Sequence, residues 1–326
     1  SPECLNGCSN NKIPLRCSMA ENSGSKNVAY FAGIGSSVIF GLSFLFTKSA
    51  LDYTNPVYFL SYRFFIAFIT INLLRVFGAI RIRPYRQFFK ELFLLGLVQP
   101  VLYFILENAG VSLSTSSEAG ILLSTIPIFV MILARIFLKE KIALPRVLSI
   151  LTALAGILLI TAGKGLSSGG TVLGPVLLLG STLTAAMYNI LSRKASAKFT
   201  PWEITYHMMT AGFSTFFTMA LVLSLLRGEP FEYLSQFFVP SVFNAALYLG
   251  TLSSVGAFFL INLMLSKLEA SRATVFAYLS TVVSLLAGII VRGERFLTVQ
   301  IFGVILILFG VWGANALSRK RLEGMK

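Results

Sequence analysis

The chain consists of ten apolar segments of about 20 residues separated by short polar breaks. About 20 apolar residues in a row can cross a bilayer as an α-helix. The runs are continuously apolar and do not alternate with polar residues, which favours helices over barrel strands. The pattern therefore predicts an all-α polytopic membrane protein. The ten expected transmembrane helices are 28–47, 56–76, 91–111, 117–138, 144–163, 172–192, 202–226, 240–265, 271–291 and 297–317.

The second half of this pattern repeats the first. A shift of 154 positions places Glu140 on Glu294, each at a charged break between two apolar runs, and a shift of 145 positions places Pro56 on Pro201. Each repeat holds five helices, an odd number, so the second repeat enters the membrane in the opposite sense. Such inverted repeats are typical of secondary transporters, whose substrate site lies near the bilayer midplane. The expected repeats are 28–163 and 172–317, joined by a Gly- and Ser-rich linker, 164–171.

Composition and charge support a membrane protein with both ends in the cytoplasm. Hydrophobic residues make up 56% of the chain and charged residues only 12%, against about a quarter in soluble domains. If the N-terminus is cytoplasmic, 21 of the 27 Lys and Arg residues lie on the cytoplasmic side and five on the other. Positive residues concentrate on the inner side of membrane proteins. The net charge of +14 is thus explained by topology. The expected partners are the lipid bilayer and a small molecule, and no nucleic acid.

The two ends of the chain are polar. Residues 1–27 have no apolar core typical of a secretory signal, and we expect them to form a disordered cytoplasmic tail. Met19 is a candidate start of the native chain. The three cysteines all lie in this tail (Cys4, Cys8 and Cys17), so neither a disulfide critical for the fold nor a metal site is expected. Residues 318–326 are expected to form a basic cytoplasmic tail.

Several short motifs carry a family resemblance that covers about 28–317. They are Phe40-Gly41-Leu42-Ser43-Phe44, Tyr62-Arg63-Phe64, Thr125-Ile126-Pro127, and the Glu140 and Glu294 breaks with Gly156 and Gly310 in the helices that follow. With the ten-helix inverted pattern, they resemble the drug/metabolite transporter superfamily, specifically the EamA-type carriers. The chain departs from that family at Phe40, where Trp is frequent, and near Thr281, where a Pro is frequent.

The resemblance implies a carrier with a central cavity lined by helices 1, 3, 4, 6, 8 and 9. Helices 5 and 10 would lie to one side, where they often form a homodimer contact. Members move amino acids, other metabolites, nucleotide sugars or drugs, and the bacterial ones are commonly exporters. The implied location is the cytoplasmic membrane of a bacterium.

Three ionisable residues fall inside the expected helices. Charged groups within a membrane are costly and mark functional sites by default. Arg63 and Glu107 lie at similar depths, so they could form a charge pair that acts as a structural latch, or they could recognise a charged substrate or couple transport to protons. His207 is either a packed residue or a proton relay. The breaks at Glu140 and Glu294 are interpreted as structural caps of the next helix.

Uncharged polar and aromatic residues are the better candidates for contacts with a small molecule. Hydrogen bonding between helices is the alternative explanation for each of them. Two pairs, Asn108 with Asn262 and Ser124 with Tyr278, are related by the repeat, as a site on the pseudo-two-fold axis requires. The predicted substrate-binding residues are Tyr103, Asn108, Ser124, Tyr188, Asn189, Tyr248, Asn262 and Tyr278.

These features predict a secondary transporter of small metabolites, foremost amino acids or related compounds, that works by alternating access and exports its substrate. The alternative is a drug exporter or a lipid or lipid-carrier flippase of the same fold. No HExxH, GxSxG, paired intramembrane aspartates or nucleotide-binding loop occurs in the sequence. We therefore expect no enzyme, no cofactor and no metal.

Overall fold

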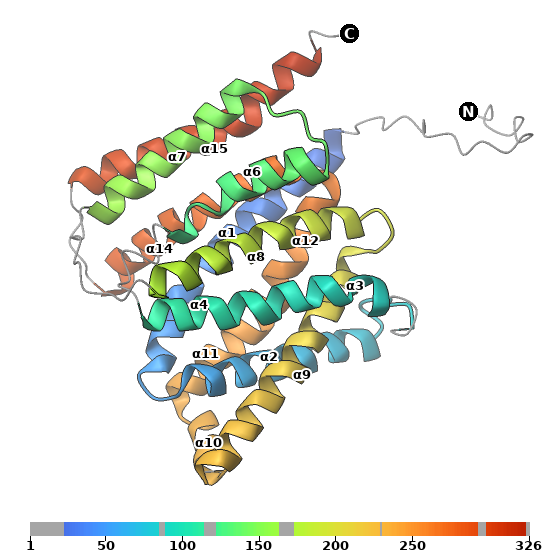
Figure 1. Cartoon of the computed structure of the whole chain (residues 1–326), viewed down its shortest axis with the longest axis vertical. Coiled ribbons are helices and arrows are strands. Elements are labelled where there is room, and N and C mark those ends of the chain that lie inside the picture. Colours follow the sequence, from blue (N-terminus) through green and yellow to red (C-terminus); the bar gives the residue numbers. More distant parts are fainter. Residues whose placement is uncertain are drawn as a thin grey trace, which may run out of the picture.

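The computed structural model of the chain describes residues 23–84, 89–113, 122–162, 173–228, 230–292 and 298–323. Within these residues all regular secondary structure is helical (Figure 1). The expectations for residues 1–22, for the linker 164–171 and for Glu294 lie outside the described residues. The first helix begins at Ser23 and the last ends at Glu323, so both reach into the segments expected to be tails.

Each of the ten expected segments overlaps a helix. The helices of the first half are α1 (Ser23–Leu51), α2 (Pro56–Val76), α3 (Phe89–Gly96), η2 (Leu97–Leu102), α4 (Tyr103–Ser112), α6 (Ile126–Phe137) and α7 (Leu144–Ala162). Those of the second half are α8 (Leu173–Ala195), α9 (Pro201–Arg227), α10 (Pro230–Phe237), α11 (Pro240–Tyr248), η3 (Leu249–Ala257), α12 (Phe258–Lys267), α13 (Ala270–Ala273), η4 (Thr274–Phe276), α14 (Ala277–Arg292) and α15 (Thr298–Glu323). The sequence did not predict the short helix α10.

Five of these stretches are long and apolar enough to cross a membrane. They are Pro56–Val76, Phe89–Gly110, Leu173–Ala195, Pro201–Arg227 and Pro240–Lys267. Shorter apolar helices occupy Asn27–Ser43, Ile126–Phe137, Leu144–Ile160 and Ile301–Ala314. An all-helical polytopic membrane protein is therefore confirmed.

The repeat-related helices α2 and α9 start in the same way. Pro56 and Pro201 each occupy the first turn of their helix. Backbone N–H groups in the first turn have no partner within the helix, so the N–H that proline lacks is not needed there. The residue before each proline accepts a hydrogen bond from a backbone N–H of the first turn: Asn55 from Val57 at 2.8 Å, and Thr200 from Glu203 at 3.3 Å. Local sequence thus determines where both helices begin.

Two of the expected helices are interrupted in the middle. In η2, Gln99 has extended backbone angles (φ −146°, ψ 121°) directly before Pro100, which cannot donate a backbone hydrogen bond. In η3, the turns over 249–257 are wider than in an α-helix. The two breaks occupy corresponding positions in the repeat, since a shift of 154 places Gln99 on Ser253. The predicted segments 91–111 and 240–265 are confirmed as membrane-length helical stretches, and the breaks within them were not predicted.

The helices of the two halves are interleaved. Helix α1 packs against α11, η3, α12 and α14 of the second half, and α8 packs against η2, α4 and α6 of the first half. Helix α2 packs against α9. Two groups result, which we name the α1 group (α1, α2, α11, η3, α12 and α14) and the α8 group (α3, η2, α4, α6, α8 and α9). Each group contains helices from both halves of the chain.

Helices α7 and α15 form a separate pair at one edge of the molecule (Figure 1). Glycines allow their close approach, because a Cβ added at Gly156 would lie 2.5 Å from the carbonyl oxygen of Gly303. A Cβ added at Gly310 would lie 2.6 Å from the Cβ of Ala153. Gly303 and Gly310 of α15 therefore serve packing within the chain. A homodimer contact through α7 and α15 stays a prediction.

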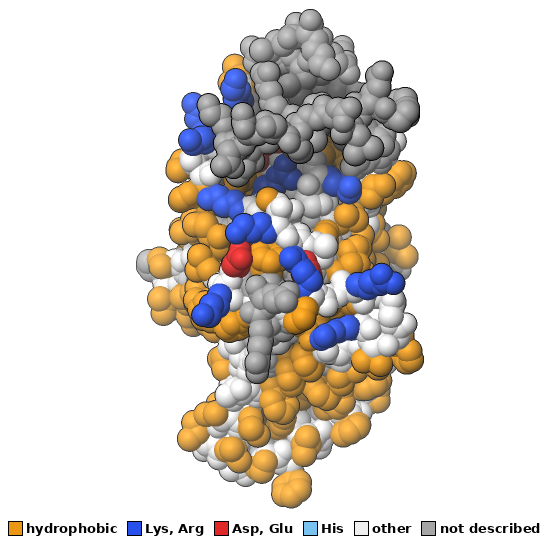
Figure 2. Space-filling view, turned by 90° about the vertical axis from the view of Figure 1, so that its right-hand side faces the viewer, with side chains coloured by type: hydrophobic (Ala, Val, Ile, Leu, Met, Phe, Trp, Pro, Cys, Tyr) orange, Lys and Arg blue, Asp and Glu red, His pale blue; other side chains and the backbone are white. Residues whose placement is uncertain are grey.

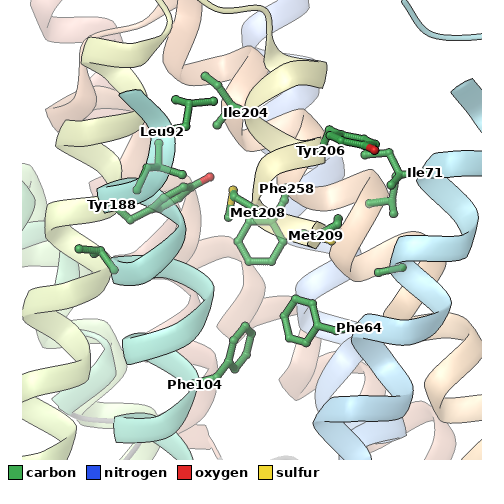
Figure 3. Packing of buried hydrophobic residues seen from close by; sticks show 14 of the residues in the cluster. Phe64, Ile71, Leu92, Phe104, Tyr188, Ile204, Tyr206, Met208, Met209 and Phe258 are labelled. Carbon is green, nitrogen blue, oxygen red and sulfur yellow. The ribbon is translucent and has the colours of Figure 1, made fainter. Parts of the chain in front are cut away.

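A large apolar core joins the two groups (Figure 3). Phe64 of α2 and Phe104 of α4 belong to this core, with their rings edge to face and 5.5 Å apart between centroids. Lys and Arg side chains gather on the side of the molecule that faces the viewer in Figure 2. We name this side the basic face. The segments that the sequence places together on one side of the membrane contain the exposed basic residues Arg75, Arg81, Arg83, Lys90, Lys139, Lys141, Lys194, Lys198 and Lys267.

Candidate substrate site

Arg63 is a buried cation in the middle of the molecule. Its side chain leaves α2 and reaches η3, where Nε donates to Ser254 Oγ at 2.8 Å and Nη2 to Ser253 Oγ at 3.2 Å. Its Cζ lies 4.9 Å from the ring centroid of Phe104, a distance at which a cation is attracted to the ring face. Sequence reasoning missed the two serines, although a Ser-Ser pair inside an apolar segment was the available signal.

Tyr103 and Glu107 face this region from α4. The hydroxyl of Tyr103 donates to Glu107 Oε1 at 2.8 Å, one helical turn away. No ion pair between Arg63 and Glu107 is found among the described residues, although the contact of Arg63 with Phe104 brings the cation against the same helix, α4. The charge-pair or coupling role of these two residues stays a prediction. The structure gives each charge a neutral hydrogen-bonding partner: serines for Arg63 and a tyrosine for Glu107.

Asn262 of α12 is the centre of a second polar cluster. Its Oδ1 accepts hydrogen bonds from the hydroxyls of Tyr188 at 2.8 Å and Ser192 at 2.7 Å, both on α8. Its Nδ2 donates to Thr205 Oγ1 of α9 at 3.0 Å and approaches Met208 Sδ at 3.8 Å. The amide is fully buried. These bonds join the α1 group to the α8 group and use the hydrogen-bonding capacity of the amide.

The other predicted residues are spread over several environments. Asn108 and Asn189 are half-buried, and each donates to a carbonyl of its own helix. Tyr248 of α11 donates to the carbonyl of Ile39 at 3.0 Å and thus ties α11 to α1. Ser124 is buried just before α6. Tyr278 packs in an apolar core formed by α7, α14 and α15, apart from the Asn262 cluster.

His207 of α9 is 1% exposed and packs against α3. A Cβ added at Gly96 would lie 2.6 Å from His207 Nε2, so only glycine fits there. The repeat places Gly96 on Gly250, and a Cβ at Gly250 would lie 2.9 Å from the carbonyl oxygen of Arg63. Repeat-related glycines of α3 and η3 thus allow the close approach of α9 and α2, at the side chain of His207 in one case and at the backbone of Arg63 in the other. The proton-relay role of His207 stays a prediction.

The basic face carries ion pairs and an open crevice. Arg83 contacts Glu203 with both ends of its guanidinium, Nε to Oε1 at 2.6 Å and Nη2 to Oε2 at 2.9 Å. The hydrogen bonds to Glu203 raise the pKa of Arg83 above its ordinary value. The crevice lies between α3 and α8 and has a volume of about 240 Å³. It is lined by Glu91, Leu92, Leu94, Leu95, Leu191, Lys194, Ala195, Lys198 and Phe199, and none of the predicted site residues is among them.

Comparisons with known proteins agree on one family. The EamA-like transporter family matches the chain twice, over residues 27–162 and 172–316. The chain is similar to the "Uncharacterized transporter YcxC" of Bacillus subtilis (strain 168), with 36% identity over 90% of this chain and 95% of the relative. An "Uncharacterized transporter" of Archaeoglobus fulgidus is 30% identical over 83% of this chain and 93% of the relative.

A solved crystal structure with 18% sequence identity has the same fold. Its TM-score to this chain is 0.72, and the match covers 89% of this chain and 98% of the other. At that identity, the likeness informs only the fold. The two matches of the family and the relatives that are transporters over nearly their whole length show that this chain belongs to the EamA-like transporter family and is an integral membrane transporter.

Proposed function

We propose that the chain is a secondary transporter that exports small metabolites, foremost amino acids or related compounds, across the cytoplasmic membrane by alternating access. The proposal rests on the arrangement of two opposite charges, Arg63 and Glu107, on the two helix groups. The cation of Arg63, on the α1 group, lies against Phe104 of α4, and the same helix of the α8 group carries the carboxylate of Glu107. An amino acid carries both opposite charges, so its carboxylate would bind near Arg63 and its ammonium near Glu107.

Pairwise packing supports the ten-helix inverted repeat that this mechanism needs. In the repeat, α1 corresponds to α8, α4 to α12 and α6 to α14. The contact of α1 with α12 therefore corresponds to that of α8 with α4, and the contact of α1 with α14 corresponds to that of α8 with α6. A pseudo-two-fold axis relating the halves requires this exchange. Since the halves are interleaved, the units proposed to rock are the α1 group and the α8 group.

The basic face supports the proposed orientation. Both described ends of the chain lie on the same side of the molecule in Figure 1, and Figure 2, turned to that side, shows the concentration of Lys and Arg. Positive residues accumulate on the cytoplasmic side of membrane proteins. We place the basic face and both termini in the cytoplasm, with the bacterial and archaeal relatives suggesting a prokaryotic cell membrane.

Flux into proteoliposomes tests the proposal. Labelled neutral, cationic and anionic amino acids would be compared with the amide of each, which lacks the carboxylate, and with the corresponding acid lacking the ammonium. We expect saturable flux only for compounds with both charges. The Arg63→Gln variant should discriminate less between an amino acid and its amide. The Glu107→Gln variant should discriminate less between an amino acid and the corresponding acid without the ammonium group. The control is Ser214→Ala, an exposed residue of α9 that bonds its own helix. Flux of apolar cations or lipids with no amino-acid flux would contradict the proposed substrate and favour the alternative.

A further inference from the structure

Glu140 joins the two halves of the chain at the basic face. It lies between α6 and α7, where it was expected to cap the helix that follows. Instead its Oε1 accepts the backbone N–H of Ala270 at 2.8 Å, and its Oε2 that of Ser271 at 3.2 Å. These residues begin α13, 130 positions further along the chain. A carboxylate at unpaired N–H groups of a helix start forms charge-assisted hydrogen bonds, so the contact is specific.

Arg146 makes a second connection beside the first. Its Nη1 donates to Ser271 Oγ at 2.7 Å, and its Nη2 lies 2.9 Å from Glu269 Oε2. The same carboxylate oxygen lies 3.1 Å from Arg272 Nε. The side chain of Arg146 is 3% exposed and that of Glu269 is 38% exposed. Glu140, Glu269, Arg146 and Arg272 thus form a cluster with no net charge. The cluster is buried at Arg146 and accessible to water at Glu269.

This cluster covers the contact between the two helix groups. Beneath it lies an apolar core formed by α1, α6, α8, α12 and α13, with Ala134 and Ala270 fully buried. Arg193 of α8 also donates to the carbonyl of Leu265 of α12 at 2.7 Å. The contact between the groups is therefore closed on the side of the basic face. On the other side of the core, Glu107 and Asn108 are half-buried.

We propose that Glu140 and Arg146, with Glu269, Ser271 and Arg272, form a latch that closes the substrate path at the basic face. This inference rests on alternating access. The path opens to the basic face when the carboxylate of Glu140 leaves the start of α13. Water then replaces both sets of hydrogen bonds, because Glu269 already contacts solvent. Ionic contacts suit such a closure, since water compensates their loss better than it compensates the exposure of an apolar core.

Cysteine labelling tests the latch without any substrate. The three native cysteines, Cys4, Cys8 and Cys17, would be changed to Ser, which leaves the described helices untouched. Ala186→Cys then places a reporter in α8 at a fully buried position of the core under the latch. In membrane vesicles of each orientation, a membrane-impermeant maleimide reports from which side the reporter is accessible. Glu140→Gln and Arg146→Gln are each expected to raise the labelling rate at least fivefold from the basic face only.

The matched control is Glu91→Gln. Glu91 pairs with Lys198 at 2.8 Å on the same face, but both residues belong to the α8 group or the loop that follows α8. In the Glu91→Gln variant, the reporter at position 186 is expected to be labelled at the same rate as in the parent. Unchanged labelling in well-folded Glu140→Gln and Arg146→Gln variants would overturn the latch. If both fail to fold, Ser271→Ala decides, because it removes one hydroxyl from the cluster and should raise labelling from the same side. A protein that transports no amino acid could still pass this test.

Discussion

The two buried polar clusters of this transporter differ in how completely they are satisfied. Around Asn262, the carbonyl oxygen of the amide accepts two bonds from α8, and its nitrogen donates to α9, with no exposed surface. Around Arg63, the cation is held by two serines, and the nearby Glu107 is held by a tyrosine in a half-buried position. A fully satisfied network fixes the structure, whereas two charges that are not paired with each other remain able to bind a ligand.

The largest effect is expected at Glu107. The Glu107→Gln variant keeps a hydrogen-bond acceptor for Tyr103 but loses the charge. We therefore expect the stimulation of flux by a pH gradient to be abolished, while flux without a gradient and the fold remain. The measurement is flux into proteoliposomes with and without the gradient, beside a thermal unfolding curve. Retained gradient-driven flux would show that Glu107 is not the proton site.

Asn262→Ala should show the opposite behaviour, with a large loss of stability. The substitution leaves the buried hydroxyls of Tyr188 and Ser192 without their shared acceptor, whereas Thr205 keeps its bond to the carbonyl of Pro201. We expect a loss of about 2 kcal/mol in the free energy of unfolding, since each unsatisfied group costs part of its desolvation energy. Denaturant unfolding in detergent micelles would measure it. The matched control is Asn189→Ala, which removes a bond only to its own helix. Equal stability of both variants would contradict a structural role of the Asn262 network.

Gly250 of η3 packs closely against α2, so a substitution at Gly250 can displace the helix that carries Arg63. A Cβ at Gly250 would lie 2.7 Å from Ile66 Cγ2 and 2.9 Å from the carbonyl oxygen of Arg63. The Gly250→Ala variant must therefore shift α2, and we expect it to lose about 1–2 kcal/mol of stability and to weaken substrate binding. Gly180→Ala is the control, because its Cβ would lie 3.3 Å from the flexible side chain of Leu106. Thermal unfolding and flux distinguish the two variants, and identical behaviour would mean that α2 has room to move.

The smallest effect is expected at the Arg83–Glu203 pair on the basic face. The pKa of Arg83 is raised by Glu203, so its contribution to stability is complete below the unfolded-state value and is lost only at very alkaline pH. The difference in melting temperature between the parent and Arg83→Gln should therefore be small and constant between about pH 7 and 9. Unfolding curves at both pH values test this, and a difference that changes with pH would indicate another titrating partner.

Prediction from sequence succeeded where the information is local. The Asn-Pro and Thr-Pro pairs set the starts of α2 and α9, and the apolar runs located the helices. It failed at Glu140, which contacts α13 and not the next helix, and it did not predict the serines that bind Arg63. Tyr278, predicted to bind substrate, packs in a core with residues of α7 and α15, and its role in binding stays a prediction.

The sequence by itself determined that this protein is an all-helical membrane transporter of the EamA type, because the length of apolar runs and short motifs are properties of single segments. Only the tertiary structure decided which polar side chains meet. These helices are apolar on nearly every side, so the pattern gives little sign of which face turns inward. The rotation of each helix, and with it the choice of Ser253 and Ser254 for Arg63, follows from packing between segments far apart in the chain.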